Sequence, residues 1–221
     1  MAAKPTRVNS RDRHQQILQV AMELFARQGF EGTTTRAIAQ RARVNEAILF
    51  RHFPHKEDLY WAVIEHRCRD ARARAGLESK LRSEAGDREV FAAIAEDILR
   101  RNTEDTTLSR LLLFSALENH RLSHRFFQSF VAKNYEMLAE HIRQRIRARV
   151  FRRVDPLLAA RGFLGMVIYH FLIQELFGAK RYQKFDLRQV SNTITDIWLR
   201  GMLARPEEPQ RSRRSAKREC I

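Results

Sequence analysis

The fold is decided by a stretch near the N-terminus, Gly32-Thr-Thr-Thr-Arg-Ala-Ile-Ala-Gln-Arg-Ala-Arg-Val-Asn-Glu-Ala-Ile-Leu-Phe-Arg-His-Phe-Pro-His-Lys56. Apolar residues recur at helical spacing on both sides of a short turn, which predicts two helices over residues 35–42 and 46–52. Thr34 and Asn45 precede these helices and are suited to cap them, because their side-chain oxygens accept from free backbone N–H groups. We expect the two helices to pack on each other and on a helix over residues 10–28 through Ile38, Ala39, Ala42, Val44, Leu49 and Phe53.

Three helices with a tight middle turn have the docking geometry of a helix-turn-helix. One exposed helix, here Glu46 to His52, enters the major groove of DNA, and the helix before it rests its N-terminus against a phosphate. The expected base readers are Glu46, Ala47, Phe50 and Arg51. Thr34, Thr35, His52 and Lys56 are expected at the sugar-phosphate backbone, Arg36 in either role, and the cap Asn45 completes the predicted DNA-binding set.

The same residues resemble the TetR family of bacterial transcriptional regulators, including its AcrR-like members. Two segments carry the resemblance, Gln28-Gly-Phe-Glu-Gly-Thr-Thr-Thr-Arg-Ala-Ile-Ala39 and Leu49-Phe-Arg-His-Phe-Pro-His-Lys-Glu-Asp-Leu59, and it extends over about residues 10–65. It implies an aromatic along the DNA backbone at Phe50, phosphate contacts at Thr34 and Lys56, and base contacts at Arg36, Glu46 and Ala47.

Two positions depart from the family pattern. Arg43 stands at a turn position that is often glycine. Glu46 stands where the first base reader is usually basic or polar, and a carboxylate prefers the N4 amino group of cytosine and repels phosphate. The base preference is therefore left open.

The rest of the chain also has the apolar spacing of helices, with only 8 glycines and 5 prolines, so we expect an all-α protein of about nine helices. Gly29 is expected to end the first helix in a left-handed conformation. Two long helices are expected over residues 155–178 and 186–204, with caps at Asp155 and Asp186. Further candidate caps are Ser10, Asp87, Thr107 and Ser123.

The expected organisation has four parts. A flexible basic N-terminus covers residues 1–9, the DNA-binding head 10–55 with its helix-turn-helix core at 34–53, a helical effector and dimerisation domain 56–204, and a disordered basic tail 205–221. The resemblance implies a homodimer paired through the last two helices, and we expect Phe163, Val167, Phe171, Ile194, Ile197 and Trp198 there. It also implies a small-molecule effector, expected to be apolar, in a pocket lined by Phe91, Ile94, Ile98, Phe114, Phe130, Tyr135, Met166 and Tyr169, although core packing explains each of these residues too.

Charge and motifs exclude several other classes. The net charge of +15 favours a polyanionic partner, and the double-stranded DNA of an operator is the expected one. We expect a cytoplasmic protein, because its two cysteines are widely spaced and the sequence shows neither a leader segment nor a long uninterrupted apolar stretch. Neither an enzyme motif nor a cofactor motif is present, so we expect no enzyme, cofactor or metal.

Three alternatives stay open. An architectural protein would bind DNA by charge alone, without sequence preference. His120 and His124 have the spacing of metal ligands if Glu118 or His170 completed the site, but solvated histidines are the favoured interpretation. The arginine-rich run of residues 143–153 is a candidate second nucleic-acid patch that is interpreted mainly as a solvated helix end.

Overall fold

The computed structural model describes residues 10–68, 71–118 and 121–204. The α-helices are α1 (Ser10–Gln28), α2 (Thr35–Arg41), α3 (Glu46–His52), α4 (Lys56–Cys68), α5 (Ala71–Leu81), α6 (Asp87–Glu104), α7 (Thr107–Leu117), α8 (Arg121–Phe126), α9 (Ala132–Arg147), α10 (Pro156–Phe171) and α11 (Leu187–Met202). The π-helical segments η1 (Phe127–Val131) and η2 (Leu172–Leu176) and the 3₁₀ turn η3 (Ala179–Arg181) complete the described elements. The predicted all-α class is confirmed, and β-pairing within these residues is limited to an isolated bridge between Phe151 and Leu203.

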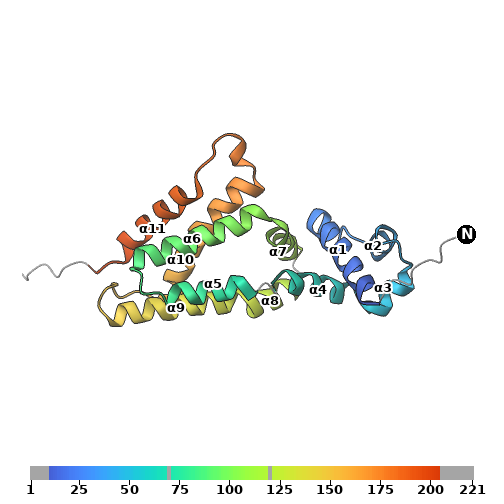
Figure 1. Cartoon of the computed structure of the whole chain (residues 1–221), viewed down its shortest axis with the longest axis horizontal. Helices are drawn as coiled ribbons and strands as arrows, with labels where there is room; N and C mark the ends of the chain where they lie inside the picture. The colour runs from blue at the N-terminus through green and yellow to red at the C-terminus, as the bar shows by residue number, and fades with distance from the viewer. Residues whose placement is uncertain (1–9, 69–70, 119–120, 205–221) are drawn as a thin grey trace, which may run out of the picture.

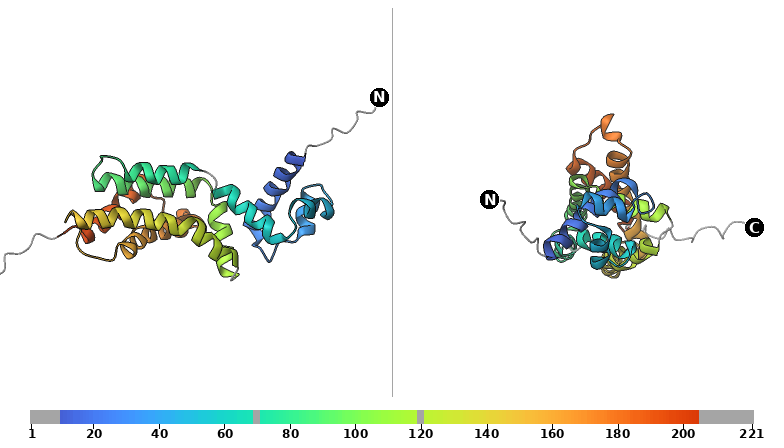
Figure 2. Two further views of the ribbon diagram at one scale, coloured as in Figure 1. Left: turned by 90° about the horizontal axis from the view of Figure 1, so that it is seen from below. Right: turned by 90° about the vertical axis from the view of Figure 1, so that its right-hand side faces the viewer.

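The molecule is elongated, with α1, α2 and α3 at one end and the long helices of the body at the other (Figure 1). The helix α4 leads from the small end into the body, where α11 packs along α6 and α10 packs against both α9 and α6. A view from below shows the same division, with α1–α3 standing apart from the parallel rods of the body (Figure 2). The described helices outnumber the nine expected because α5 and α8 were not distinguished in the sequence.

Two groups of buried apolar side chains hold this arrangement. The head cluster consists of Ile17, Leu18, Ala21, Leu24, Phe25, Ala26, Phe30, Ile38, Ala39, Ala42, Leu49, Phe53, Leu59, Tyr60, Trp61, Val63, Ile64, Leu111 and Phe126. The body cluster consists of Val90, Phe91, Ile94, Ala95, Leu99, Leu138, Ala139, Ile142, Phe151, Ala160, Phe163, Val167, Phe171, Val190, Trp198, Leu199 and Met202. Because Leu111 lies on α7 and Phe126 on α8, the head cluster draws on the body as well as on α1–α4.

Helix ends follow the sequence at several positions. Gly29 has φ +74° after α1, as expected, and Asp155 and Asp186 cap α10 and α11 by accepting from the backbone N–H groups of Leu158 and Gln189. The caps expected at Asp87, Thr107 and Ser123 are wrong. Asp87 and Thr107 are already the first helical residues, and Ser123 lies inside α8.

Residues 1–9 and 205–221 lie outside the described residues, so the expected basic termini stay predictions. The boundary expected between residues 55 and 56 also stays a prediction.

Candidate nucleic-acid interface

The turn between α2 and α3 is tight and is built by an arginine in an unusual backbone conformation. Arg43 has φ 52°, which is the left-handed region that glycine adopts without strain. The backbone N–H of Val44 donates to the Ala39 carbonyl at 2.9 Å, and this bond closes the turn. An exposed arginine therefore adopts here a backbone conformation that favours glycine.

Side-chain caps fix the starts of both helices, as predicted. The Thr34 hydroxyl oxygen accepts from the Ala37 N–H at 3.1 Å, and the Asn45 Oδ1 atom accepts from the Ile48 N–H at 2.8 Å. A further bond joins the first residues of the two helices, because the Thr35 hydroxyl donates to the Glu46 carboxylate at 2.7 Å. The turn and both helix starts thus form one hydrogen-bonded unit.

The helix α3 has a buried face and an outward face. Leu49 is completely buried in the head cluster, whereas Ala47, Phe50 and Arg51 are exposed, and 42% of the large apolar Phe50 side chain faces solvent. A single exposed apolar side chain is ordinary on a protein surface, so Phe50 indicates a contact surface only through its place on the outward face of α3. Arg36 is exposed on α2.

Lys56 and His52, which are also expected at the sugar-phosphate backbone of DNA, have partners within the protein as well. Lys56 lies with its Nζ atom 4.1 Å from the centre of the Phe30 ring, a cation–π contact that holds the start of α4 against the end of α1. The His52 ring lies 5.8 Å from the His14 ring in an edge-to-face arrangement. Partial burial lowers the pKa of His14, and the nearby charge of protonated His52 lowers it further.

Contacts between the head and α7 were missed in the sequence. The Arg110 Nε atom donates to the Ala26 carbonyl at 2.8 Å, and the Glu118 carboxylate accepts from the Phe30 N–H at 3.1 Å. Ala26 lies in the last turn of α1, where helix carbonyls lack partners within the helix, and Phe30 follows two residues after the helix ends. Tyr60 is fully buried and donates its hydroxyl to the Leu111 carbonyl at 2.7 Å, so α4 is also tied to α7. No sequence signal joins residues that lie 51 to 88 positions apart.

The residues expected to line an effector pocket are divided between the two apolar clusters and the surface, and their role stays a prediction. Phe91 and Ile94 belong to the body cluster, with Ile98 and Met166 packed against it, whereas Phe130 packs against the head cluster. Phe114 lies near the Arg110 side chain, Tyr135 lies beside Phe127, and Tyr169 is 66% exposed. Apolar spacing marks the inward side of each helix, and it does not separate a cavity wall from a filled core.

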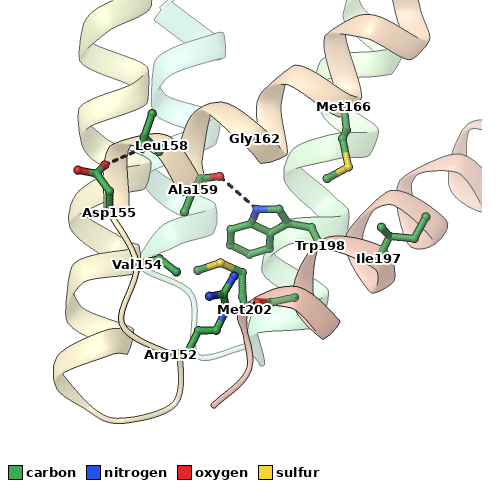
Figure 3. A pocket seen from close by; sticks show the side chains of 11 residues that line it. Arg152, Val154, Asp155, Leu158, Ala159, Gly162, Met166, Ile197, Trp198 and Met202 are labelled. Atoms are coloured by element: carbon green, nitrogen blue, oxygen red, sulfur yellow. Dashed lines mark hydrogen bonds between the residues drawn. The ribbon is translucent and has the colours of Figure 1, made fainter. Parts of the chain in front are cut away.

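A groove of about 520 Å³ is present elsewhere, between the start of α10 and the end of α11 (Figure 3). Its lining residues are Arg152, Val154, Asp155, Leu158, Ala159, Gly162, Met166, Ile197, Trp198, Gly201 and Met202. The Trp198 ring forms its floor and donates Nε1–H to the Ala159 carbonyl at 3.1 Å. Met166 is the member of the expected pocket set that lines this groove.

The residues expected at a dimer interface are mostly part of the protomer's own core. Phe163, Val167 and Phe171 are buried in the body cluster together with Trp198, and Ile194 packs against that cluster. Ile197 is the member that faces outward, with 61% of its surface exposed. The apolar stripe of α10 points inward within the protomer, its opposite side carries exposed Leu158, Ile168 and Tyr169, and the dimer interface itself stays a prediction.

Two further features bear on the alternatives. The segment Pro156–Leu176 is long and apolar enough to cross a membrane by length and composition alone, which the sequence analysis did not recognise. Among the described residues no three histidine, cysteine or carboxylate side chains converge as metal ligands, and His120 lies outside that part of the chain. The Nε2 atom of His124 lies 2.9 Å from the Gln128 side-chain nitrogen.

Comparison with known proteins gives two family matches. Residues 17–63 match the family described as bacterial regulatory proteins, tetR family, and residues 88–201, more than half of the chain, match the AefR-like transcriptional repressor C-terminal domain. A nucleoid occlusion factor of Vibrio atlanticus, SlmA, is 31% identical over 164 residues, which cover 71% of this chain and 80% of that protein.

Other similar proteins share smaller parts or only the fold. An HTH-type transcriptional repressor of Mycobacterium tuberculosis is 48% identical over 50 residues, and the match spans 23% of this chain and 27% of the relative's length. A TetR-family regulator from Mesorhizobium loti has the same fold, with a TM-score of 0.67 at 20% identity over 90% of this chain and all of that one. The flavonoid-responsive regulator FrrA has a TM-score of 0.63 at 25% identity, covering 88% of this chain and 98% of its own. The chain therefore belongs to the TetR family of bacterial regulatory proteins.

Proposed function

We propose that this protein is a ligand-responsive transcriptional repressor that binds a palindromic operator as a homodimer and is released by a small-molecule inducer. The observation that carries the DNA-binding part is the orientation of α3, in which Leu49 faces the core while Ala47, Phe50 and Arg51 face solvent. A short exposed helix held by caps on a compact core is the element that enters a major groove. The proposed activity is the binding of DNA and of a small molecule, without catalysis.

The proposed contacts divide into two kinds. Glu46, Ala47, Phe50 and Arg51 lie at or near base edges, and Arg36 supplies a base or phosphate contact. Thr34, Asn45, His52 and Lys56 surround them at the level of the sugar-phosphate backbone, and Thr35 lies at the same level with its hydroxyl bonded to Glu46. Lys56 can exchange its contact with the Phe30 ring for a phosphate, because the residue as a whole is only half-buried.

The proposed dimer rests on uncovered apolar surface. Only 22% of the most apolar window of Pro156–Leu176 is buried within one protomer, and the apolar residues Leu158, Ile168 and Tyr169 are exposed there. Gly162, Gly165 and Gly201 leave open space beside α10 and α11, where another helix can approach closely. In the proposed dimer, a second copy of the chain covers these two helices. Because a partner chain then shields their apolar surface, we propose that the protein lies in the cytoplasm and not in a membrane.

The effector part rests on the size of the body and on relatives. The helices after residue 55 form a second large apolar core, which a head that only reads DNA does not need. FrrA, whose fold is similar, is described as flavonoid-responsive. An apolar inducer is proposed to favour a spacing of the two heads that no longer fits successive major grooves, about 34 Å apart.

Selection of bound sites from a random duplex library at physiological salt tests the proposal. A palindromic consensus is expected, and Phe50→Ala should weaken binding to it at least tenfold while leaving thermal unfolding unchanged. The net charge of +15 supports one competing function, an architectural DNA-binding protein. Binding without a consensus and with a steep dependence on salt would establish that competitor instead.

A further inference from the structure

The bond between Thr35 and Glu46 joins the two helices of the helix-turn-helix at their first residues. The Thr35 hydroxyl lies 2.7 Å from Oε1 of Glu46, and both side chains are half-buried. The neighbouring caps fix the backbone at both positions. Thr34 caps α2, which begins with Thr35, and Asn45 caps α3, which begins with Glu46. The two side chains therefore meet on a frame that is fixed on both sides.

Among the described residues, Thr35 is the side chain that binds the Glu46 carboxylate. None of the ion pairs in the described part of the chain includes its carboxylate, and its hydrogen bond is the one from Thr35. A glutamate side chain has several rotatable bonds, and a single bond to one oxygen selects among its conformations. The second oxygen, Oε2, stays available as an acceptor.

A carboxylate at this place needs such restraint. The phosphates beside the groove repel a carboxylate, so a mobile Glu46 side chain would rotate away from them and out of register with the base edges. Held by Thr35, it presents an acceptor to the base edges. Cytosine offers an amino donor at N4 there, whereas adenine sets its amino group beside the N7 acceptor, which repels a carboxylate.

We propose that Thr35 is a positioning residue that sets the base choice of Glu46, so that the pair together favours cytosine at one position of each half-site. Thr35 acts on specificity through Glu46, and not chiefly through a phosphate. The inference rests on the proposed function, because it needs the outward face of α3 to meet base edges.

The test starts from the duplex that the wild-type full-length protein selects from a random library. Variants of that duplex carry each of the four base pairs at every half-site position, and their affinities are compared by competition. The protein variants are Thr35→Val, which keeps the shape and removes the hydroxyl, Thr35→Ser, which keeps the hydroxyl, Glu46→Gln, and the double variant.

The wild type should prefer cytosine at one position, and Glu46→Gln should lose that preference. Thr35→Val should reduce it about two- to tenfold, which is the range expected for one hydrogen bond. Thr35→Ser should retain it. In the Glu46→Gln background, Thr35→Val should cause no further change in base preference, because Thr35 then has no carboxylate to position.

Two results would overturn the inference while leaving the proposed function in place. One is an unchanged base preference in Thr35→Val. The other is a uniform loss of affinity on all duplexes, in both backgrounds, which would make Thr35 a phosphate contact. A wild-type protein that selects no consensus would remove the proposed function and the inference together. Thermal unfolding of each variant confirms that the compared proteins are folded.

Discussion

Replacing Arg110 by methionine should loosen the attachment of the head to the body. Methionine keeps an unbranched apolar stem over the same surface but removes the guanidinium that donates to the Ala26 carbonyl at 2.8 Å. That carbonyl is among the last four of α1 and has no partner within the helix, so the substitution leaves it without the donor that α7 supplies. The head would then be held to α7 by the remaining contacts.

The size of the effect follows from the kind of bond and its exposure. A hydrogen bond to a charged group contributes about 1.5–3 kcal/mol when protected, and Arg110 is half-buried, so we reduce this to about 1–2 kcal/mol. The weak contact of its guanidinium with the Phe114 ring, 6.0 Å away, adds about 0.5 kcal/mol. The free energy of unfolding should therefore fall by about 1.5–2.5 kcal/mol.

Urea denaturation at one fixed protein concentration measures this change, with the slope m expected to stay constant. Lys133→Met is a matched control, because Lys133 is exposed on α9, outside the helices α1–α4 of the head. A loss below about 0.5 kcal/mol for Arg110→Met, or an equal loss in the control, would refute the argument that α7 completes the end of α1.

Three further predictions concern the turn, the histidines and the dimer. Arg43→Gly should raise the free energy of unfolding by about 0.5–1 kcal/mol in urea denaturation, because glycine relieves the strain of φ 52°, and a decrease would show that the arginine side chain stabilises the turn. The lowered pKa of His14 means that the unfolded chain binds protons first as the pH falls through about 6.5, so stability should fall there. His14→Gln should flatten that dependence in thermal unfolding, and an unchanged slope would contradict this role. Ile197→Glu, on the exposed side of α11, should convert the proposed dimer into a monomer at micromolar concentration in sedimentation, whereas the control Arg188→Glu should not.

Local signals in the sequence were sufficient for the DNA-binding head. Thr34 and Asn45 cap the helices that they precede, and Leu49 is buried while Phe50 is exposed, because capping and helical spacing depend on neighbours within four residues. The departure at Arg43 was also visible, and its positive φ shows that the turn geometry is kept without glycine.

The body was harder to predict, because its site assignments depend on which sides of its helices face each other. Phe163 and Val167 repeat at the spacing of an apolar stripe, and the spacing alone gives no sign that this stripe meets α6 and α9 rather than a partner chain. Asp87 and Thr107 were expected as caps, but the helices begin one residue earlier than that assignment requires. In α7, the Asp105 carboxylate accepts from the Thr107 N–H at 2.8 Å and takes over the capping role.

The head cluster has a practical consequence for attempts to exchange parts between regulators. Leu111 and Phe126 complete its apolar interior, although they follow the helix-turn-helix by more than fifty residues. A chimera that grafts residues 10–55 onto another regulator would contain the DNA-reading surface but not the side chains of Leu111 and Phe126. The apolar side chains that these two residues cover would then be exposed. A transplant designed to keep its operator preference should carry the matching positions of α7 and α8 with it.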